Sequence, residues 1–308
     1  MDTEIKITRR QALAAGAALP VSGTLAGSAY AKADLMGPSS AVHSRFTLGS
    51  FEVTTLLAGS TPRDEVQGIF GMNVSADEFA KVSAENFIPA DKAQFYFTPT
   101  VVNAGAELIL FDTGLNADGI TGALASGGYT PDQIDVVVLT HMHGDHIGGL
   151  MKDGAATFPN ARYVTASTEF DHWNGTDNER FDGNVKPLAE QMTFIEDGGS
   201  VASGVTAMSA HGHTPGHTAY MIESDGKSVL LAADFANHYV WSLGYPDWEV
   251  RFDMDKAAAA ATRRKLLGML AAEKIPFVGY HMPFPAVGYV ETRDDGFRYV
   301  PASYQLAL

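Results

Sequence analysis

The stretch "VLTHMHGDHIGG", residues 138–149, places His141, His143, Asp145 and His146 within six positions. It directly continues an apolar run that is typical of a buried strand. Side chains in a loop at a strand end are held on a rigid support and can reach a common point. The cluster therefore indicates a metal site and not a set of scattered surface histidines.

More potential ligands occur later in the chain. His211, His213 and His217 fall in "AHGHTPGHTAY", His281 follows the β-like run "PFVGY", and Asp234 ends the apolar run "SVLLAAD". The chain has no cysteine, so thiolate-ligated sites are excluded and a nitrogen and oxygen ligand set remains.

The spacing of these residues suits more than one ion. From a tight loop, His141 and His143 can reach one metal at about 2.0–2.1 Å. After a turn at Gly144, Asp145 and His146 can point to a second metal. The other candidate ligands are His213, Asp234 and His281.

Asp234 has a special position among these candidates, because a carboxylate at a strand end can bridge two cations. Two divalent ions about 3.5–4 Å apart would share a bridging hydroxide and polarise a carbonyl or phosphoryl oxygen. We therefore assign Asp145 and Asp234 catalytic as well as ligand roles. Zinc is the expected metal, although manganese, cobalt and iron accept the same ligands.

Composition limits the possible partners. The chain has 308 residues, 45% of them hydrophobic, which is enough for one large domain or two small ones. With 21 Lys and Arg against 36 Asp and Glu, the net charge is −15, which disfavours a nucleic-acid substrate. A small, largely apolar molecule fits better. After the N-terminal region no stretch has eighteen uninterrupted apolar residues, so we expect no membrane span.

The first 31 residues differ from the rest. Arg9 and Arg10 precede a mildly apolar stretch and the small-x-small sequence Ala29-Tyr30-Ala31. This pattern predicts a twin-arginine export signal and a periplasmic location, with residues 32–308 as the functional domain. An ordinary flexible N-terminus is the alternative.

Strand and helix patterns alternate along the remaining chain. Residues 45–59 and 98–114 predict β-hairpins, Val136–Leu139 a buried strand, and residues 255–275 a helix with an apolar stripe. Further short strands are expected around residues 161–167 and between 204 and 234. We expect an α+β fold with two packed mixed β-sheets and helices on the outer faces.

"HMHGDH", followed by "GHTPGH", a strand-terminal aspartate and a late histidine, resembles the metallo-β-lactamase superfamily, which has an αβ/βα sandwich fold with a dinuclear site between the sheets. The resemblance implies one metal on His141, His143 and His213. It implies the other on Asp145, His146 and His281, with Asp234 bridging. Asp112 in "FDTG" and His217 would support the ligands from behind.

The C-terminal half is similar to the methyl parathion hydrolases and their lactonase relatives, in "FPNARYVTAS", "GHTPGHTAY", "HMPFPAVGYV" and "GFRYVPASY". That resemblance implies a homodimer with an apolar pocket over the metals. After Asp234 the chain reads "FANHYV", in a region where such relatives differ. The residues that we select as pocket candidates are Phe95, Phe97, Trp173, Asn237, His238 and Phe284.

The leading hypothesis is a dinuclear hydrolase that cleaves a lactone, a carboxyl ester or an organophosphate triester with a metal-bridging hydroxide. A glyoxalase-II-like thioesterase is one alternative, although no basic cluster for an anionic thiol conjugate is evident. A catalytically inactive metal-binding protein that binds a partner is another. A pocket wide enough for an aryl group would favour the first hypothesis.

Overall fold

The computed structural model describes residues 39–307. The chain divides into a unit of residues 1–39 and a compact unit of residues 40–308, and the second unit holds the fold. The export signal predicted for residues 1–31 lies outside the described residues.

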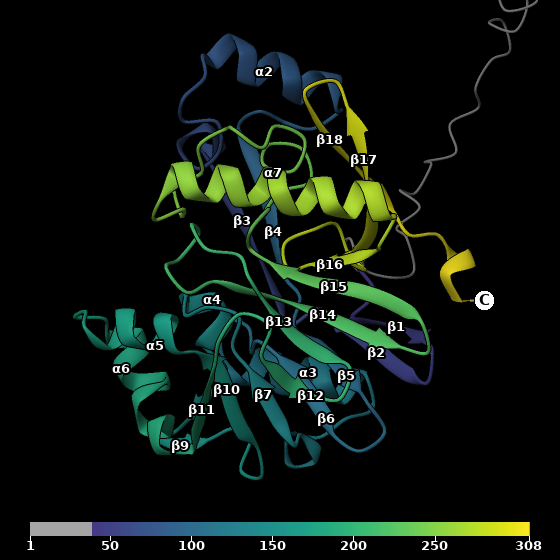
Figure 1. Ribbon diagram of the computed structural model, residues 1–308. Coiled ribbons are helices and arrows are strands. Elements are labelled where there is room, and N and C mark those ends of the chain that lie inside the picture. The colour runs from purple at the N-terminus through teal and green to yellow at the C-terminus, as the bar shows by residue number, and fades with distance from the viewer. Residues whose placement is uncertain (1–38, 308) are drawn as a thin grey trace, which may run out of the picture. The chain divides into compact units, whose positions relative to one another are not determined.

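Two seven-stranded mixed sheets form the centre of this unit (Figure 1). In the first sheet the strands β6, β7, β10 and β11 run parallel, and the strands before them are antiparallel. Its strands, in spatial order, are β1 (His43–Leu48), β2 (Phe51–Leu56), β5 (Thr100–Asn103), β6 (Leu108–Phe111), β7 (Val136–Val138), β10 (Arg162–Ala166) and β11 (Met192–Ile195).

The second sheet is formed by the later part of the chain. Only β15 and β16 pair in parallel within it, and the other neighbours are antiparallel. Its strands are β12 (Ser200–Ala202), β13 (Val205–Ser209), β14 (Thr218–Ser224), β15 (Lys227–Ala233), β16 (Phe277–Gly279), β17 (Val287–Arg293) and β18 (Gly296–Pro301).

Helices cover the sheets from outside. The helix α7 packs on β17, α3 on β2 and α5 on β10. The α-helices are α2 (Ala76–Glu85), α3 (Ala117–Ser126), α4 (Gly144–Ile147), α5 (Ser167–Asn174), α6 (Glu179–Asn184) and α7 (Lys256–Glu273). Short 3-10 helices are η1 (Val66–Gly68), η2 (Pro131–Gln133), η3 (Lys186–Gln191) and η4 (Tyr304–Ala307). Within residues 39–307, no helix combines the length and apolarity needed to span a bilayer.

Two small hairpins complete the structure: β3 (Gly59–Asp64) with β4 (Lys92–Phe97), and β8 (Met151–Lys152) with β9 (Ala155–Ala156). The sequence analysis did not place the first of these, because "GSTPRD" is polar and contains proline, as loops do. In its partner β4, more buried and more exposed residues alternate, and β3 pairs with that strand along its whole length.

The expected mixed sheets, outer helices and two β-hairpins are present. In the first hairpin Leu48 pairs with Phe51, so Gly49 and Ser50 form a two-residue turn. Gly49 has φ +60°, and a Cβ there would lie 2.4 Å from the carbonyl oxygen of Ser224. Only glycine suits this turn, which connects β1 to β2 and lies against Ser224 of the second sheet.

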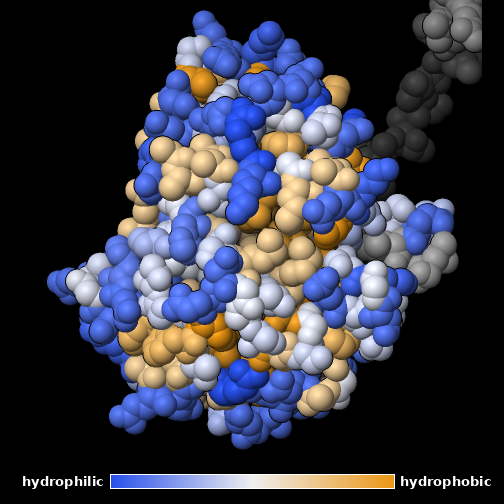
Figure 2. All heavy atoms as spheres, in the orientation of Figure 1, coloured by the Kyte–Doolittle hydropathy of each residue, from blue (hydrophilic) through white to orange (hydrophobic). Residues whose placement is uncertain are grey.

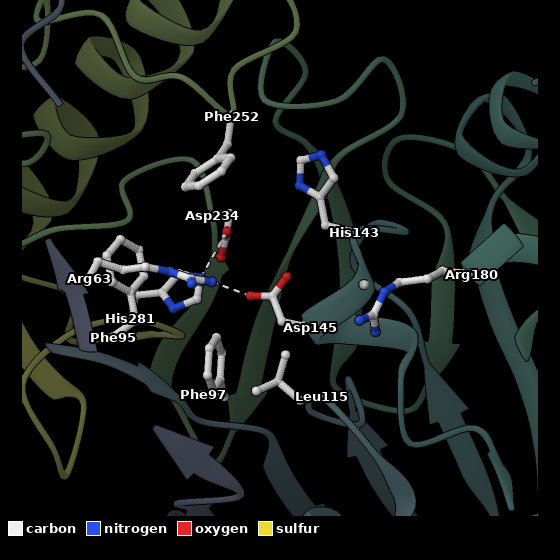
Figure 3. A pocket seen from close by; sticks show the side chains of 11 residues that line it. Arg63, Phe95, Phe97, Leu115, His143, Asp145, Arg180, Asp234, Phe252 and His281 are labelled. Carbon is white, nitrogen blue, oxygen red and sulfur yellow. Dashed lines mark hydrogen bonds and ion pairs between the residues drawn. The ribbon is translucent and has the colours of Figure 1, made fainter. Parts of the chain in front are cut away.

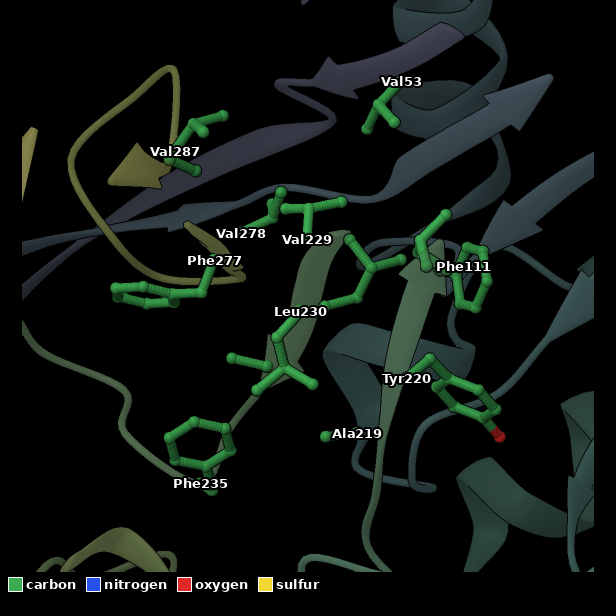
Figure 4. Close-up of a cluster of buried hydrophobic side chains, with 14 of the residues drawn as sticks. Val53, Phe111, Ala219, Tyr220, Val229, Leu230, Phe235, Phe277, Val278 and Val287 are labelled. Atoms are coloured by element: carbon green, nitrogen blue, oxygen red, sulfur yellow. The ribbon is translucent and has the colours of Figure 1, made fainter. Parts of the chain in front are cut away.

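The main core lies between the two sheets (Figure 4). Phe111 of the first sheet packs on Tyr220 of the second with ring centroids 5.3 Å apart. Leu266, Leu267 and Leu270 of α7 belong to the same buried cluster. On the face of the molecule that Figure 2 shows, hydrophilic residues predominate, with apolar patches between them. The packed sheets therefore form the rigid support from which the strand-end loops project.

We predict that Val229→Ala in this core destabilises the protein. Val229 is fully buried, and losing two methyl groups there should cost roughly 1.5–3 kcal/mol of unfolding free energy, counting the cavity left behind. Urea unfolding followed by circular dichroism measures it. The matched control Val42→Ala, at a side chain 48% exposed, should change stability by less than about 0.5 kcal/mol. Equal effects at both positions would contradict this assignment of the core.

Candidate metal centre

The seven candidate ligands project from loops that follow strands of both sheets. The cluster from His141 to His146 follows β7, Asp234 follows β15, and His281 follows β16. His213 lies in the loop between β13 and β14. These loops meet, so that residues up to 140 positions apart share one site (Figure 3).

Three imidazoles converge in a first group. The Nε2 atom of His141 lies 3.1 Å from Nδ1 of His143, which lies 3.0 Å from Nε2 of His213. Ligands about 2.0–2.1 Å from one tetrahedral ion lie about 3.3 Å from one another. The three nitrogen atoms therefore have nearly the separation that a shared ion requires.

A second group contains Asp145, His146 and His281. Oδ2 of Asp145 lies 3.7 Å from Nε2 of His146 and 3.4 Å from Nε2 of His281. Asp234 stands between the groups: its Oδ1 is 3.4 Å from His146 Nε2, and its Oδ2 is 3.4 Å from His213 Nε2. The Asp234 carboxylate can therefore reach ions in both groups.

Hydrogen bonds behind the ligands set the histidine tautomers. Nδ1 of His281 donates to the carbonyl oxygen of Tyr96 at 2.7 Å, and Nδ1 of His213 donates to Asp253 at 2.9 Å. An acceptor at Nδ1 places the proton there, which leaves the Nε2 lone pair facing the other ligands. A neutral imidazole in this tautomer can bind a metal ion through Nε2.

Asp112 fixes the tautomers of two more ligands, His146 and His141. It accepts from Nδ1 of His146 at 2.8 Å and from the Thr140 hydroxyl at 2.8 Å. Because that hydroxyl donates to Asp112, its oxygen accepts from Nδ1 of His141 at 3.1 Å. Both Nε2 atoms are left as lone-pair donors. Asp112 has φ +60°, an unusual conformation that this network holds in place.

The donor set fits divalent cations. Among the described residues, Nε2 of His146 and Oδ1 of Asp234 are buried without a hydrogen-bond partner, which is costly unless another group satisfies them. All seven side chains offer nitrogen or carboxylate oxygen, the ligands that zinc accepts in the absence of thiolates. Ions in the two groups would satisfy both atoms.

A buried ion pair supports His213 from behind. Asp253, just before α7, accepts from His213 and also from two guanidinium nitrogens of Arg263, each at 3.1 Å. The Arg263 side chain is 1% exposed and also donates to the carbonyl of Pro246. Neither residue could be found from the sequence, because no local motif links them to His213, which lies 40 and 50 positions away.

Glu169 is a further buried residue that the sequence analysis missed. Its carboxylate accepts from the backbone of Met142, the indole of Trp173, the hydroxyl of Thr214 and the backbone of Gly216, at 2.7–2.9 Å. It therefore ties the His141 loop to the His213 loop. His217, expected behind the ligands, accepts from the backbone N–H of Asp234 at 3.0 Å through Nε2.

A cavity of about 240 Å³ opens onto the ligands (Figure 3). Phe95 and Phe97, two of the pocket candidates, form part of its wall, and their ring centroids lie 5.5 and 5.7 Å from that of His281. Its full lining is Arg63, Phe95, Phe97, Leu115, His143, Gly144, Asp145, Arg180, Asp234, Phe252 and His281.

The other four pocket candidates lie outside this lining. Trp173 packs its ring edge against His143, with centroids 5.7 Å apart, and bonds to Glu169. Asn237 is buried, and Phe284 is only partly buried, away from the cavity. His238 stacks on Trp241 at 4.1 Å, and burial lowers its pKa to about 3.

The histidine pKa values differ between the two groups of ligands. Burial lowers the pKa of His141, and it lowers that of His143 to about 3, so both are neutral at neutral pH. Burial also opposes protonation of His146 and His281, yet the adjacent carboxylate of Asp234 raises the pKa of both. Without cations, protons therefore occupy the second group more readily than the first.

Residues 98–276, more than half of the chain, match the family model described as the metallo-beta-lactamase superfamily. An N-acyl homoserine lactonase of Bacillus thuringiensis is 31% identical over 118 residues, covering 38% of this chain and 44% of the relative. The chain thus matches less than half of that relative's length.

Two solved structures have a similar fold. AidC, described as a dizinc quorum-quenching lactonase, superposes with a TM-score of 0.79 at 24% identity, covering 86% of this chain and 99% of that one. The hydrolase AbOPH gives a TM-score of 0.79 at 23% identity, covering 87% and 99%. At these identities the likeness establishes the fold.

We predict that metal binding releases protons and strengthens as pH rises. A group whose pKa is raised holds its proton until the pH exceeds that pKa, and a ligand must lose its proton to bind. An ion held by His146 and His281 should therefore be lost on acidification before an ion held by His141, His143 and His213. Calorimetric zinc titrations at several pH values measure this, and two ions with identical pH dependence would contradict it.

We also predict that Asp253→Asn weakens metal binding. The substitution removes the charge that orients His213, and such partners are typically worth about 10–100-fold in metal affinity. Competition against a chromophoric chelator measures the change. The matched control Asp247→Asn alters an exposed carboxylate that pairs with Arg264 and should leave the affinity unchanged. Equal affinities for all three proteins would refute the role given to Asp253.

Proposed function

The chain belongs to the metallo-β-lactamase superfamily, and on that premise we propose that it is a metal-dependent hydrolase that opens a lactone or a carboxyl ester. One observation carries the proposal: the converging ligands form the floor of an aromatic-walled cavity, which His143, Asp145, Asp234 and His281 line. A substrate in that cavity would contact the centre directly.

Two divalent ions, most simply zinc, would lower the pKa of a water molecule and polarise the substrate's carbonyl oxygen. Asp234 would keep the two ions together, since its oxygens face both groups. Oδ2 of Asp145 faces His146 and His281, and Asp145 also lines the cavity. Its carboxylate would accept the attacking water's proton and pass it to the leaving alkoxide.

The cavity favours a small substrate. Its volume of about 240 Å³ is below the range of about 300–1,000 Å³ typical of sites for drug-sized ligands. Phe95 and Phe97 provide apolar wall for a lactone ring or a short chain. The similarity to an N-acyl homoserine lactonase supports a lactone, ahead of the organophosphate triester, which needs the same attack geometry at phosphorus.

A thioester of an anionic thiol is the second candidate. The sequence analysis found no basic cluster for such a conjugate, but Arg63 and Arg180 both line the cavity, on either side of the ligands (Figure 3). Guanidinium groups bind carboxylates in bidentate geometry. A binding protein without activity is less well supported, because none of the seven ligands is missing from the site.

Export and assembly belong to the same proposal. We propose that Arg9 and Arg10 direct the folded, metal-containing protein to the periplasm through the twin-arginine pathway. We also propose a homodimer, which rests on the resemblance to the methyl parathion hydrolase group.

We expect the zinc-containing protein to hydrolyse N-hexanoyl homoserine lactone faster than an aryl ester, a glutathione thioester or a dialkyl aryl phosphate. Asp234→Asn should lower kcat/KM by on the order of 100-fold or more, whereas Asp247→Asn should not. Initial rates at pH 7.5 provide the comparison. The proposal fails if the zinc-containing protein leaves every substrate intact, or if Asp234→Asn retains full activity with its metal bound.

For export, the variant with Arg9→Lys and Arg10→Lys should accumulate in the cytoplasm with its N-terminal residues uncleaved. Cell fractionation and mass spectrometry of the N-terminus report both properties. Unchanged export of this variant would exclude the twin-arginine route.

A further inference from the structure

A second cavity, of about 460 Å³, borders the metal centre from another side. The β3–β4 hairpin separates it from the first cavity. Successive residues of a strand face opposite sides, so the two faces of the hairpin can line different cavities. His281 borders both cavities. The hairpin residues Arg63, Phe95 and Phe97 line the metal cavity, whereas Pro62, Lys92, Gln94 and Tyr96 line the second one.

The walls of the second cavity are mainly apolar. Ile88 and Pro89 come from the segment after α2, Trp241 and Tyr239 from the segment after Asp234, and Pro283 from the loop after β16. Trp241 is 1% exposed and is fixed by the hydrogen bond from its indole to the hydroxyl of Ser83. A rigid aromatic side chain thus borders the cavity.

His238 contributes one polar atom, Nε2, to this apolar wall. Its Nδ1 accepts hydrogen bonds from the backbone N–H groups of Val240 and Trp241, both at 3.1 Å. An accepting Nδ1 carries no proton, so the neutral ring has its proton on Nε2. His238 is 9% exposed and lines the cavity, and within residues 39–307 no group accepts from Nε2. The ring therefore offers a fixed, unused donor.

A positive charge stands at the rim. Lys92 is exposed and lines the cavity, and no carboxylate in the described part of the chain lies within 4 Å of its ammonium group. Asp64 pairs with Lys92 in the hairpin register, yet the two side chains form no ion pair. In a chain of net charge −15, a cation and a buried donor that line the same cavity favour an anionic group.

We propose that the second cavity binds a medium-chain carboxylate, with its alkyl tail against Trp241 and Ile88. The carboxylate accepts from Nε2–H of His238 and faces Lys92. The volume is within the usual range for small-molecule sites of about 300–1,000 Å³. This site is separate from the proposed hydrolysis and does not depend on it.

A ligand there would contact a residue that orients a metal ligand. Tyr96 lines the cavity with its side chain, and its carbonyl oxygen accepts from Nδ1 of His281. Because His281 itself also borders the cavity, a ligand there would lie directly against the second metal group.

Titration calorimetry of octanoate into the full-length zinc-containing protein tests the proposal, with 1-octanol as the neutral comparison. His238→Asn is the first variant: an asparagine oxygen can still accept from the Val240 and Trp241 N–H groups. Its amide nitrogen then takes the place of ring Cδ2 and not of Nε2, so the donor is withdrawn from the cavity. Gln94→Trp is the second, since it fills the cavity. Gln191→Trp, at an exposed residue of η3, is the control for the bulky substitution.

We expect one octanoate per chain in the wild type and in Gln191→Trp. Affinity should fall about tenfold or more in His238→Asn, and Gln94→Trp should not bind. The affinities of the wild type and of His238→Asn for octanol should differ by less than about threefold, because octanol is neutral and has no carboxylate that depends on this donor.

Three results would overturn the proposal. If the wild-type protein binds no octanoate, the proposed site does not exist. If both cavity variants bind octanoate like wild type, the carboxylate sits on the metal ions. If the wild type is a dimer that ignores octanoate and Gln94→Trp is a monomer, a second copy of the chain covers the cavity. Hydrolysis rates are measured separately, so a failure of the proposed activity leaves these outcomes unchanged.

Discussion

The rest of the site depends on one electrostatic constraint: buried nitrogen and oxygen lone pairs that face one another need cations between them. His141, His143 and His213 bring three ring nitrogens to about 3 Å, and Asp234 adds a carboxylate that faces two more imidazoles. Neutral rings in these tautomers repel each other at such distances. Two divalent ions would turn that repulsion into binding energy and would so link metal binding to folding.

The fold supplies what the ligands alone do not have, a fixed orientation for each ring. Asp112 reaches His146 from the first sheet, Asp253 reaches His213 from the start of α7, and the Tyr96 carbonyl reaches His281 from β4. Each supporting group lies on a different element. Rigid strand ends and a buried ion pair therefore set the site's geometry, while the β3–β4 hairpin and the loops around it shape the space above the site.

The sequence predicted which candidate ligands converge far better than it predicted their surroundings. Motif spacing and strand ends point to His141, His143 and Asp234, because these features are local. Asp253, Arg263 and Glu169 could not be found, since their partners are distant in sequence and any buried carboxylate has the same local appearance. Among aromatics, Phe95 and Phe97 line the cavity but Trp173 packs behind His143, a difference that depends on which side of a loop faces the ions.

The measurement that tests this account most directly is the metal content of the purified protein by elemental analysis, after dialysis against zinc and removal of free metal. The account predicts close to two zinc ions per chain, and close to one when His281→Ala removes a ligand of the second group only. Fewer than one ion per wild-type chain, or an unchanged content in His281→Ala, would contradict the claim that these residues hold a dinuclear centre.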